Sequence, residues 1–307
     1  MFKNVIVFRI GADWKAPAIS TLEDMLQKNR FMPCAATQTE SFGWVSPRNE
    51  EHSPMLEAQS GHFILKLSGE RKTVPASAVK HELEIRCKAI EAQRGKKPGR
   101  KEKKEMKEDI QHELLPRAFS KFSSNFVWID TNAGYLVIGT GSMRAADAVV
   151  THVVAAMAAA SAVIELKPIH TELSPAKAMA HWLETRVAPS GFTLDQECEL
   201  RQQDDSKAVV RYSRHTLDIE EIGQHIRGGK APSKLAMTYD DKVSFVLGDD
   251  MGIRKIKFSD NIFKDAGDAK DFDANVAIAT AELSPLFDDL INALGGEIEL
   301  GAAQADA

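Results

Sequence analysis

The sequence predicts an α+β protein made of two structurally related halves, each with the element order β-α-β-β-α-β-β-α. Three observations support this class. Short segments of alternating apolar residues, rich in Val and Ile, are typical of strands. Between them lie longer segments whose apolar residues recur every three or four positions, as in amphipathic helices. The order of segments repeats after about residue 162, so we expect halves at 1–162 and 163–297 and a mobile tail at 298–307.

In the first half we expect strands at 2–10, 41–45, 62–67, 125–130 and 135–138, with helices at 17–30, from 75 onward and at 145–160. The helix from residue 75 carries Val79, Leu83, Cys87 and Ile90 at the spacing of a core-facing stripe. Pro98 and Gly99 interrupt it, so a second helix can begin near Arg100.

In the second half we expect strands at 163–167, 192–200, 208–212, 234–239, 243–247 and 253–258, and helices at 175–187, 217–226 and 272–294. The clearest difference between the halves is the longer second helix of the first half. Its excess, about residues 88–112, contains a strongly basic segment. A duplicated scaffold with one cationic arm suits a curved subunit that faces a polyanion on its inside.

Composition excludes several classes of protein. Of 307 residues, 43% are apolar and 27% charged, as in soluble globular proteins. The most apolar segment, 145–162, contains Asp147 and His152 and is too short for a membrane span. The N-terminus has no signal-peptide pattern, and three distant cysteines predict free thiols in a reducing cytoplasm. We therefore expect a cytoplasmic protein without a membrane partner.

The basic segment, residues 94–107, has a net charge of +6, and because the whole chain is −5 the remainder sums to −11. On a helix, Arg100, Lys103, Lys104 and Lys107 share an arc of roughly 100°, with the apolar stripe of Met106, Ile110 and Leu114 on another face. Such a helix would dock by its apolar face and present cations to a polyanion. The plainer alternatives are a solvated charged helix or a disordered loop around Gly95 to Gly99. The cations of the segment are Arg94, Lys96, Lys97, Arg100, Lys101, Lys103, Lys104 and Lys107.

A resemblance to a known family rests on several short motifs. "LLPRAFSKFS…WIDT" in 114–131, together with "FKNVIVFRI", "FMPC", "GWVSP", "KLAM" and "LINALGGE", resembles the RdgC family over about residues 2–297. The resemblance implies a non-enzymatic DNA-binding protein of the nucleoid. It implies subunits that form a closed ring dimer around duplex DNA and hinder the function of RecA filaments.

The resemblance also implies roles for particular residues. Phe119, in an expected exposed turn between Arg117 and Lys121, corresponds to a phenylalanine at a subunit contact. A second contact corresponds to 211–215, where Arg214 and His215 replace the Lys and Gln of the family pattern. Together with the basic segment, we expect four further cations to contact DNA, namely Arg117, Lys121 and, in a glycine-rich loop at 228–234, Lys230 and Lys234.

The preferred function is sequence-independent binding of duplex DNA through its phosphates, because no Asn, Gln and Arg set suggests base readout. A metal-dependent nuclease would need the pairs Asp204-Asp205, Asp240-Asp241 and Asp249-Asp250 to converge, whereas aspartate pairs are more typical of turns. A protein-interaction module would use the basic segment on an acidic partner. We predict no catalytic residue, metal or cofactor.

Overall fold

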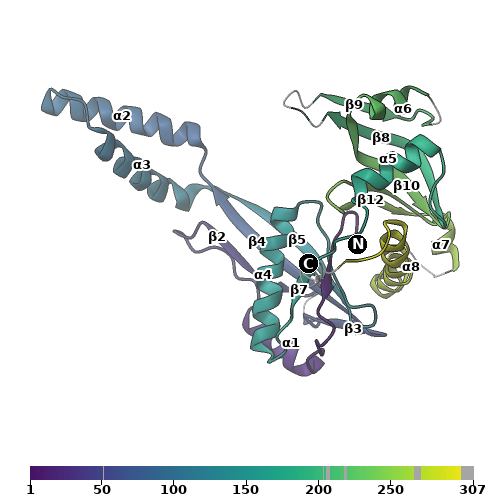
Figure 1. Ribbon diagram of the computed structural model, residues 1–307. Coiled ribbons are helices and arrows are strands. Elements are labelled where there is room, and N and C mark those ends of the chain that lie inside the picture. Colours follow the sequence, from purple (N-terminus) through teal and green to yellow (C-terminus); the bar gives the residue numbers. More distant parts are fainter. Residues whose placement is uncertain (51, 203, 205–207, 218–219, 266–270, 299–307) are drawn as a thin grey trace, which may run out of the picture.

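The computed structural model describes residues 1–50, 52–202, 204, 208–217, 220–265 and 271–298. It confirms the α+β class, with two antiparallel sheets, helices against them and a projecting pair of helices (Figure 1). The projecting helices and the second sheet diverge from the first sheet, so that the subunit has an open, angular outline (Figure 1).

The first sheet has the strand order β2-β4-β5-β6-β1-β7, with β3 paired to β4. Helices α1 (Ile19–Lys28) and α4 (Met143–Ala159) cover one of its faces, since Leu22 and Val153 share a core with Leu65 and Ile129. The strands are β1 (Ile6–Ile10), β2 (Glu40–Val45), β3 (Glu57–Gln59), β4 (His62–Thr73), β5 (Phe119–Asp130), β6 (Tyr135–Ile138) and β7 (Leu166–Pro168).

Strands β4 and β5 are about twice as long as the sequence predicts. They pair without a break from His62 opposite Asp130 to Thr73 opposite Phe119. Their outer parts, 68–73 and 119–124, are mostly polar, so they show no alternation from which a strand could be predicted. Backbone pairing holds this region, and the buried Glu70 carboxylate adds to it by accepting hydrogen bonds from the Ser120 hydroxyl and the Cys34 N–H.

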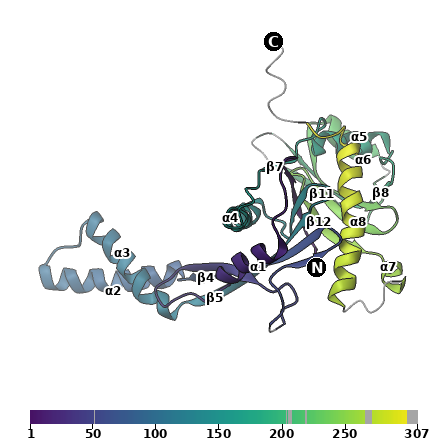
Figure 2. The same ribbon diagram turned by 90° about the horizontal axis from the view of Figure 1, so that it is seen from below.

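The outer part of β4 and β5 leads into a helical hairpin, α2 (Ala76–Arg94) and α3 (Arg100–Leu114), far from the rest of the chain (Figures 1 and 2). The predicted break at 95–99 is confirmed. Gly95 ends α2 in the left-handed conformation, with φ 66°, and its N–H donates to the Glu91 carbonyl at 2.8 Å. Buried Val79 and Ile110 place the two apolar stripes against each other. A short 3-10 turn, η1 (Leu115–Arg117), then leads to β5.

The second sheet has the order β12-β11-β10-β8-β9. One of its faces packs against α5 (Pro175–Thr185) and α6 (Glu220–Arg227), because Met179, Trp182 and Ile222 share a core with its strands. A short helix, α7 (Asp260–Asp265), follows the last strand. The strands are β8 (Phe192–Gln202), β9 (Val209–Ser213), β10 (Lys230–Tyr239), β11 (Val243–Gly248) and β12 (Ile253–Phe258).

Helix α8 (Phe272–Ala293) connects the two sheets through one shared core. The ring of Phe287 lies 5.9 Å from that of Trp128 and 5.8 Å from that of Tyr135, both in the first sheet. Pro285 lies inside the helix without ending it. At the N-terminus, Val5 pairs with Ile253 of β12. The two sheets are therefore packed together through a common set of buried side chains.

The strand pairing does not repeat as the sequence led us to expect. In the first sheet the strand before the inserted helices, β4, pairs with the strand after them, β5. In the second sheet β9 precedes α6, yet β8 pairs with β10. Strand β7, beyond residue 162, joins the first sheet by pairing with β1. A similar order of elements along the chain does not determine which strands pair. Of the predicted tail, residues 299–307 lie outside the described residues.

We predict that Gly43→Ala in β2 destabilises the fold by roughly 2 kcal/mol, because the interior is already close-packed there. A Cβ at Gly43 would lie 2.4 Å from the Cα of Phe31, whose N–H donates to the Trp44 carbonyl. Urea unfolding followed by circular dichroism measures the change. The matched control is Gly99→Ala, since Gly99 has φ −70° and no atom within 4 Å of such a Cβ. Equal unfolding midpoints for the two variants would contradict the prediction.

Candidate nucleic-acid interface

The tip of the helical hairpin carries the whole basic segment, and all eight of its cationic side chains are exposed. Four of them have acidic neighbours. Arg94 Nη1 lies 2.8 Å from Glu102 Oε1 across the turn between the helices. Lys97, Lys101 and Lys104 lie at 3.9 Å from Glu91, Glu105 and Glu108. Exposed pairs of this length are weak and are screened by salt, so these lysines stay available to other anions.

The other four cations of the segment, Lys96, Arg100, Lys103 and Lys107, have no ion pair within the described part of the chain. Arg100, Lys103 and Lys107 follow one exposed side of α3. The predicted docking stripe is confirmed, since Ile110 is buried and Met106 and Leu114 are half-buried. Helix α3 therefore presents a row of cations to solvent.

The base of the hairpin carries Phe119, Arg117 and Lys121, all exposed. Phe119 is 91% exposed, and it starts β5 opposite Thr73 rather than lying in the predicted turn. Lys121 follows on the same strand, opposite Arg71. A large apolar side chain with so little cover from its own chain is a candidate contact for another molecule. The structure thus places these three residues and the basic segment on one projecting arm.

Lys230 and Lys234 lie elsewhere, on the second sheet (Figure 1). They were predicted in a loop, but they belong to β10, because the turn ends at Gly229 with φ 90°. Lys230 Nζ lies 3.3 Å from His225 Nδ1, and Lys234 Nζ donates to Glu199 at 3.1 Å. Both lysines therefore already have a polar neighbour within the chain.

Glu199, which sequence reasoning did not single out, organises the charges around Lys234. Glu199 is 4% exposed, and its carboxylate accepts hydrogen bonds from Ser233 at 2.8 Å, Arg211 at 2.7 Å and Lys234. Arg201 lies 3.1 Å away. Burial alone would raise the pKa of Glu199, but these hydrogen bonds outweigh it and lower the pKa to about 2. The sequence does contain a signal for this buried carboxylate, because Glu199 lies between two core residues of the same strand, Cys198 and Leu200.

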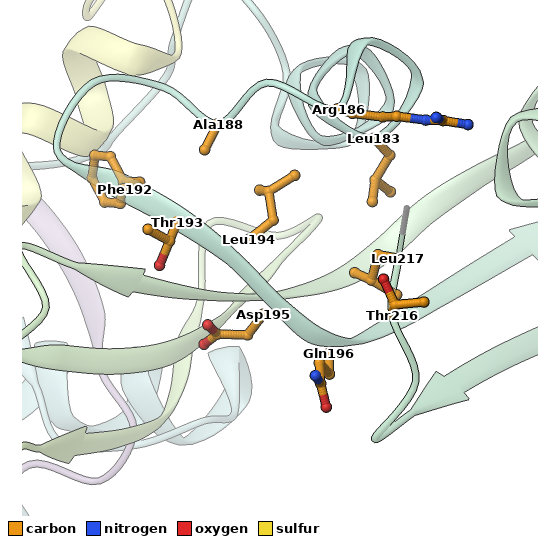
Figure 3. Close-up of a pocket in the computed structure, with 10 residues that line it drawn as sticks. All are labelled: Leu183, Arg186, Ala188, Phe192, Thr193, Leu194, Asp195, Gln196, Thr216 and Leu217. Atoms are coloured by element: carbon orange, nitrogen blue, oxygen red, sulfur yellow. The ribbon is translucent and has the colours of Figure 1, made fainter. Parts of the chain in front are cut away.

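Arg214 and His215 lie just after β9, at the edge of the second sheet. Arg214 has a left-handed backbone with φ 55°, and His215 Nδ1 lies 2.8 Å from the Thr216 carbonyl oxygen. Beside them is a pocket of about 410 Å³, into which Leu183 of α5 and Leu194 of β8 point (Figure 3). The two predicted subunit contacts are therefore on different sheets, Phe119 on the first and this segment on the second.

The acidic pairs lie in turns where the structure describes them. Asp240 and Asp241 connect β10 to β11 with positive φ angles, and Asp249 and Asp250 lie between β11 and β12. Asp205 lies outside the described residues. Among the residues that the structure covers, no three His, Cys, Asp or Glu side chains form a group that could hold a metal ion, and no helix is long and apolar enough to cross a membrane. Cys34, Cys87 and Cys198 are free.

These features define a class of two-sheet α+β proteins that project a cationic helical hairpin. A family model described as "Putative exonuclease, RdgC" matches residues 1–297. Three similar proteins, each named "Recombination-associated protein RdgC", come from Herminiimonas arsenicoxydans (40% identity), Janthinobacterium sp. strain Marseille (39%) and Cupriavidus pinatubonensis (41%). The alignments cover 96%, 97% and 96% of this chain and 98%, 99% and 98% of those proteins. The chain belongs to the RdgC family, as the sequence motifs indicated.

We predict that Glu199→Gln destabilises the protein at neutral pH by on the order of 2 kcal/mol, since one pKa unit corresponds to about 1.4 kcal/mol. Because the pKa is lowered on folding, the stabilisation is fully present above the unfolded value of 4.5 and is lost as the pH falls towards 2. Urea unfolding at pH 7 and pH 3 should show the difference between variant and unmodified protein shrinking at the lower pH. Glu105→Gln, on the exposed tip, is the control. A difference that is the same at both pH values would contradict the prediction.

Proposed function

We propose that the protein binds duplex DNA without sequence preference, as a ring-shaped homodimer that encircles the duplex and restrains RecA-mediated recombination. The observation that carries the proposal is the row of Arg100, Lys103 and Lys107, which is exposed on a projecting helix and has no ion pair among the described residues. Membership of a family whose members are named recombination-associated supports DNA as the polyanion. The nucleoid is then the expected location.

The chemistry of the row favours phosphate contacts over base contacts. Lys and Arg on an exposed helix attract phosphates and release condensed counterions, which supplies affinity independent of sequence. Such contacts fix the position of a protein on the duplex but read no bases. The hairpin would therefore bind a duplex of any sequence.

The length of the arm separates the cations at its tip from the negative charge of the rest of the subunit. Outside the basic segment the chain sums to −11, which repels DNA. The outer parts of β4 and β5 span six residues each, or about 20 Å at the rise of a strand. That distance exceeds the Debye length of about 8 Å at physiological ionic strength. Phosphates at the tip are therefore largely shielded from the acidic body.

A two-fold dimer would join like surfaces of two subunits. Phe119 and the segment at Arg214 and His215 lie on the two diverging parts of the subunit, so two copies could meet at both places and enclose a space (Figure 1). DNA threaded through such a ring stays bound even when individual contacts are weak. The ring would then occupy DNA on which a RecA filament must assemble.

We predict that the triple variant R100Q/K103Q/K107Q lowers the salt dependence of duplex DNA binding. Each lost phosphate contact should reduce the slope of log K against log salt by about 0.9, hence by roughly 3 for one hairpin and up to twice that when both subunits contact DNA. Gln keeps the helix propensity. Fluorescence anisotropy with random-sequence duplexes at several salt concentrations measures the slope.

The matched control for this triple variant is K15Q/K28Q/K177Q, which removes three exposed lysines outside the arm. It should leave the slope nearly unchanged. Equal slopes for the triple variant and the unmodified protein would show that the hairpin is not the DNA-binding surface. End-labelled duplex incubated with the protein and Mg²⁺ tests the alternative of a nuclease, which would shorten the DNA.

We predict that Phe119→Ala weakens dimerisation by roughly 2 kcal/mol or more, because buried aromatic residues contribute most of the energy of small interfaces. Retention on closed circular DNA should fall with it. Analytical ultracentrifugation across a dilution series measures the dissociation constant. Phe122→Ala is the control, since Phe122 is also exposed but lies on the other face of β5. An unchanged dissociation constant for Phe119→Ala would remove Phe119 from the interface.

A further inference from the structure

The second sheet has one face that the helices leave open. Cys198 and Leu200 of β8 point into the core shared with α5, α6 and α8, so Glu199 between them points to the opposite face. There Glu199 is in register with Arg211 of β9 on one side and with Lys234 of β10 on the other. One carboxylate thus holds a cation on each neighbouring strand, and the three charges form a row across the sheet.

This open face is hollowed along its surface. Two adjoining cavities, of about 500 and 400 Å³, share Glu197, Ser213, Val246 and Lys255 in their walls, so they form one continuous groove. Three carboxylates line it, Asp195, Glu197 and Glu199. Six cations line it as well, namely Arg211, Arg214, Lys234, Arg254, Lys255 and Lys257. The groove is therefore positive on a chain whose net charge is −5.

Three of the groove's cations, Arg254, Lys255 and Lys257, lie on β12. Lys255 Nζ reaches Glu197 at 2.5 Å, and Arg254 Nη1 is held by Asp250 at 2.8 Å. Lys257, which is exposed, has no ion pair within the described residues. Glu199 is buried between its own cations, so it presents little negative charge to a ligand. On β12, Lys257 therefore keeps its charge for an anion, and Lys255 shares its charge with Glu197.

The dimensions of the groove suit a run of phosphates. From Arg211 on β9 to Lys257 on β12 the sheet crosses four strand spacings, or about 19 Å. Successive phosphates of one DNA strand advance by about 3.4 Å along the helix axis, so several of them fit across this face. Ala236 and Val246 contribute an apolar part of the groove lining, against which a sugar could pack.

We infer that this groove is a second phosphate-binding surface, which takes the sugar–phosphate backbone of the duplex DNA that the hairpin also contacts. The inference rests on the proposed function, and it adds Lys255 and Lys257 as contact residues and Glu199 as the residue that positions Arg211 and Lys234. The duplex is favoured as occupant because the groove repeats the chemistry of the hairpin, an excess of Lys and Arg over carboxylates on an exposed surface.

The test is the salt dependence of binding to random-sequence duplex DNA by K255Q/K257Q in the full-length protein. Each lost contact should lower the slope by about 0.9, so by up to about 1.8 for each subunit. A gain-of-charge variant, Ser244→Lys, places a cation in register with Lys257 on the same face and should steepen the slope by up to about 0.9. K15Q/K28Q serves as the control for the double variant, and circular dichroism checks folding in each case.

The outcomes separate this inference from the proposed function. Slopes that fall for K255Q/K257Q and rise for Ser244→Lys support the groove. If R100Q/K103Q/K107Q lowers the slope while both groove variants match the unmodified protein, the groove inference is wrong and the proposed function stands. If the unmodified protein fails to bind duplex DNA, both are wrong. Binding of fluorescent poly-glutamate that depends on Lys255 and Lys257, without an effect of these lysines on DNA, would assign the groove to an acidic protein instead.

Discussion

The uninterrupted pairing of β4 with β5 is the constraint on which the rest of the molecule depends. Over twelve residues the two strands are hydrogen-bonded to each other, although the outer half offers few apolar side chains to bury. The pairing starts in the core of the first sheet and ends where the helical hairpin begins. Because the hairpin is attached only through these strands and η1, their register sets where its cations lie.

The body that holds these strands depends in turn on α8. Its Phe287 packs on Trp128 and Tyr135, the Tyr135 hydroxyl donates to Asp288, and the Ser284 hydroxyl donates to Asp130 at 2.7 Å. These contacts bind the helix to the first sheet, while its other side belongs to the core of the second. The angle between the sheets is thus fixed by packing rather than by a linker, so the hairpin and the groove keep a defined relation.

Much of this fold could be predicted from the sequence where local patterns suffice. The helical hairpin could be predicted, because helix periodicity and helix breakers are local signals. The signals were the apolar stripes of α2 and α3 and the break at Pro98 and Gly99. The outer half of β4 could not be predicted, since its residues show no alternation and their partner lies about fifty residues away. The pairing of β8 with β10 likewise depends on which strands meet in space.

In the candidate site, too, only the features that depend on neighbouring residues could be predicted from the sequence. Exposure of the basic segment follows from its charge, but the pair of Arg94 with Glu102 needs the turn that brings residues eight apart together. The groove could not be predicted, because its cations come from β8's neighbours on both sides and from β12 at the far edge. In the sequence, Glu199 is only one charged position in a predicted strand. Its two cationic partners, Arg211 and Lys234, follow from the pairing of β8 with β9 and β10.

The distance between the hairpin tip and the acidic body has a consequence for how the molecule meets a ligand. A charge of +6 at one end and −11 over the remainder gives the subunit a large electric dipole moment along the arm. In the field of a polyanion such a dipole experiences a torque as well as a force, so rotation aligns the arm before any contact forms. Encounters in which the tip arrives first are then favoured over those in which the body does. The fraction of productive collisions should therefore depend on the length of β4 and β5 as much as on the number of lysines they carry outward.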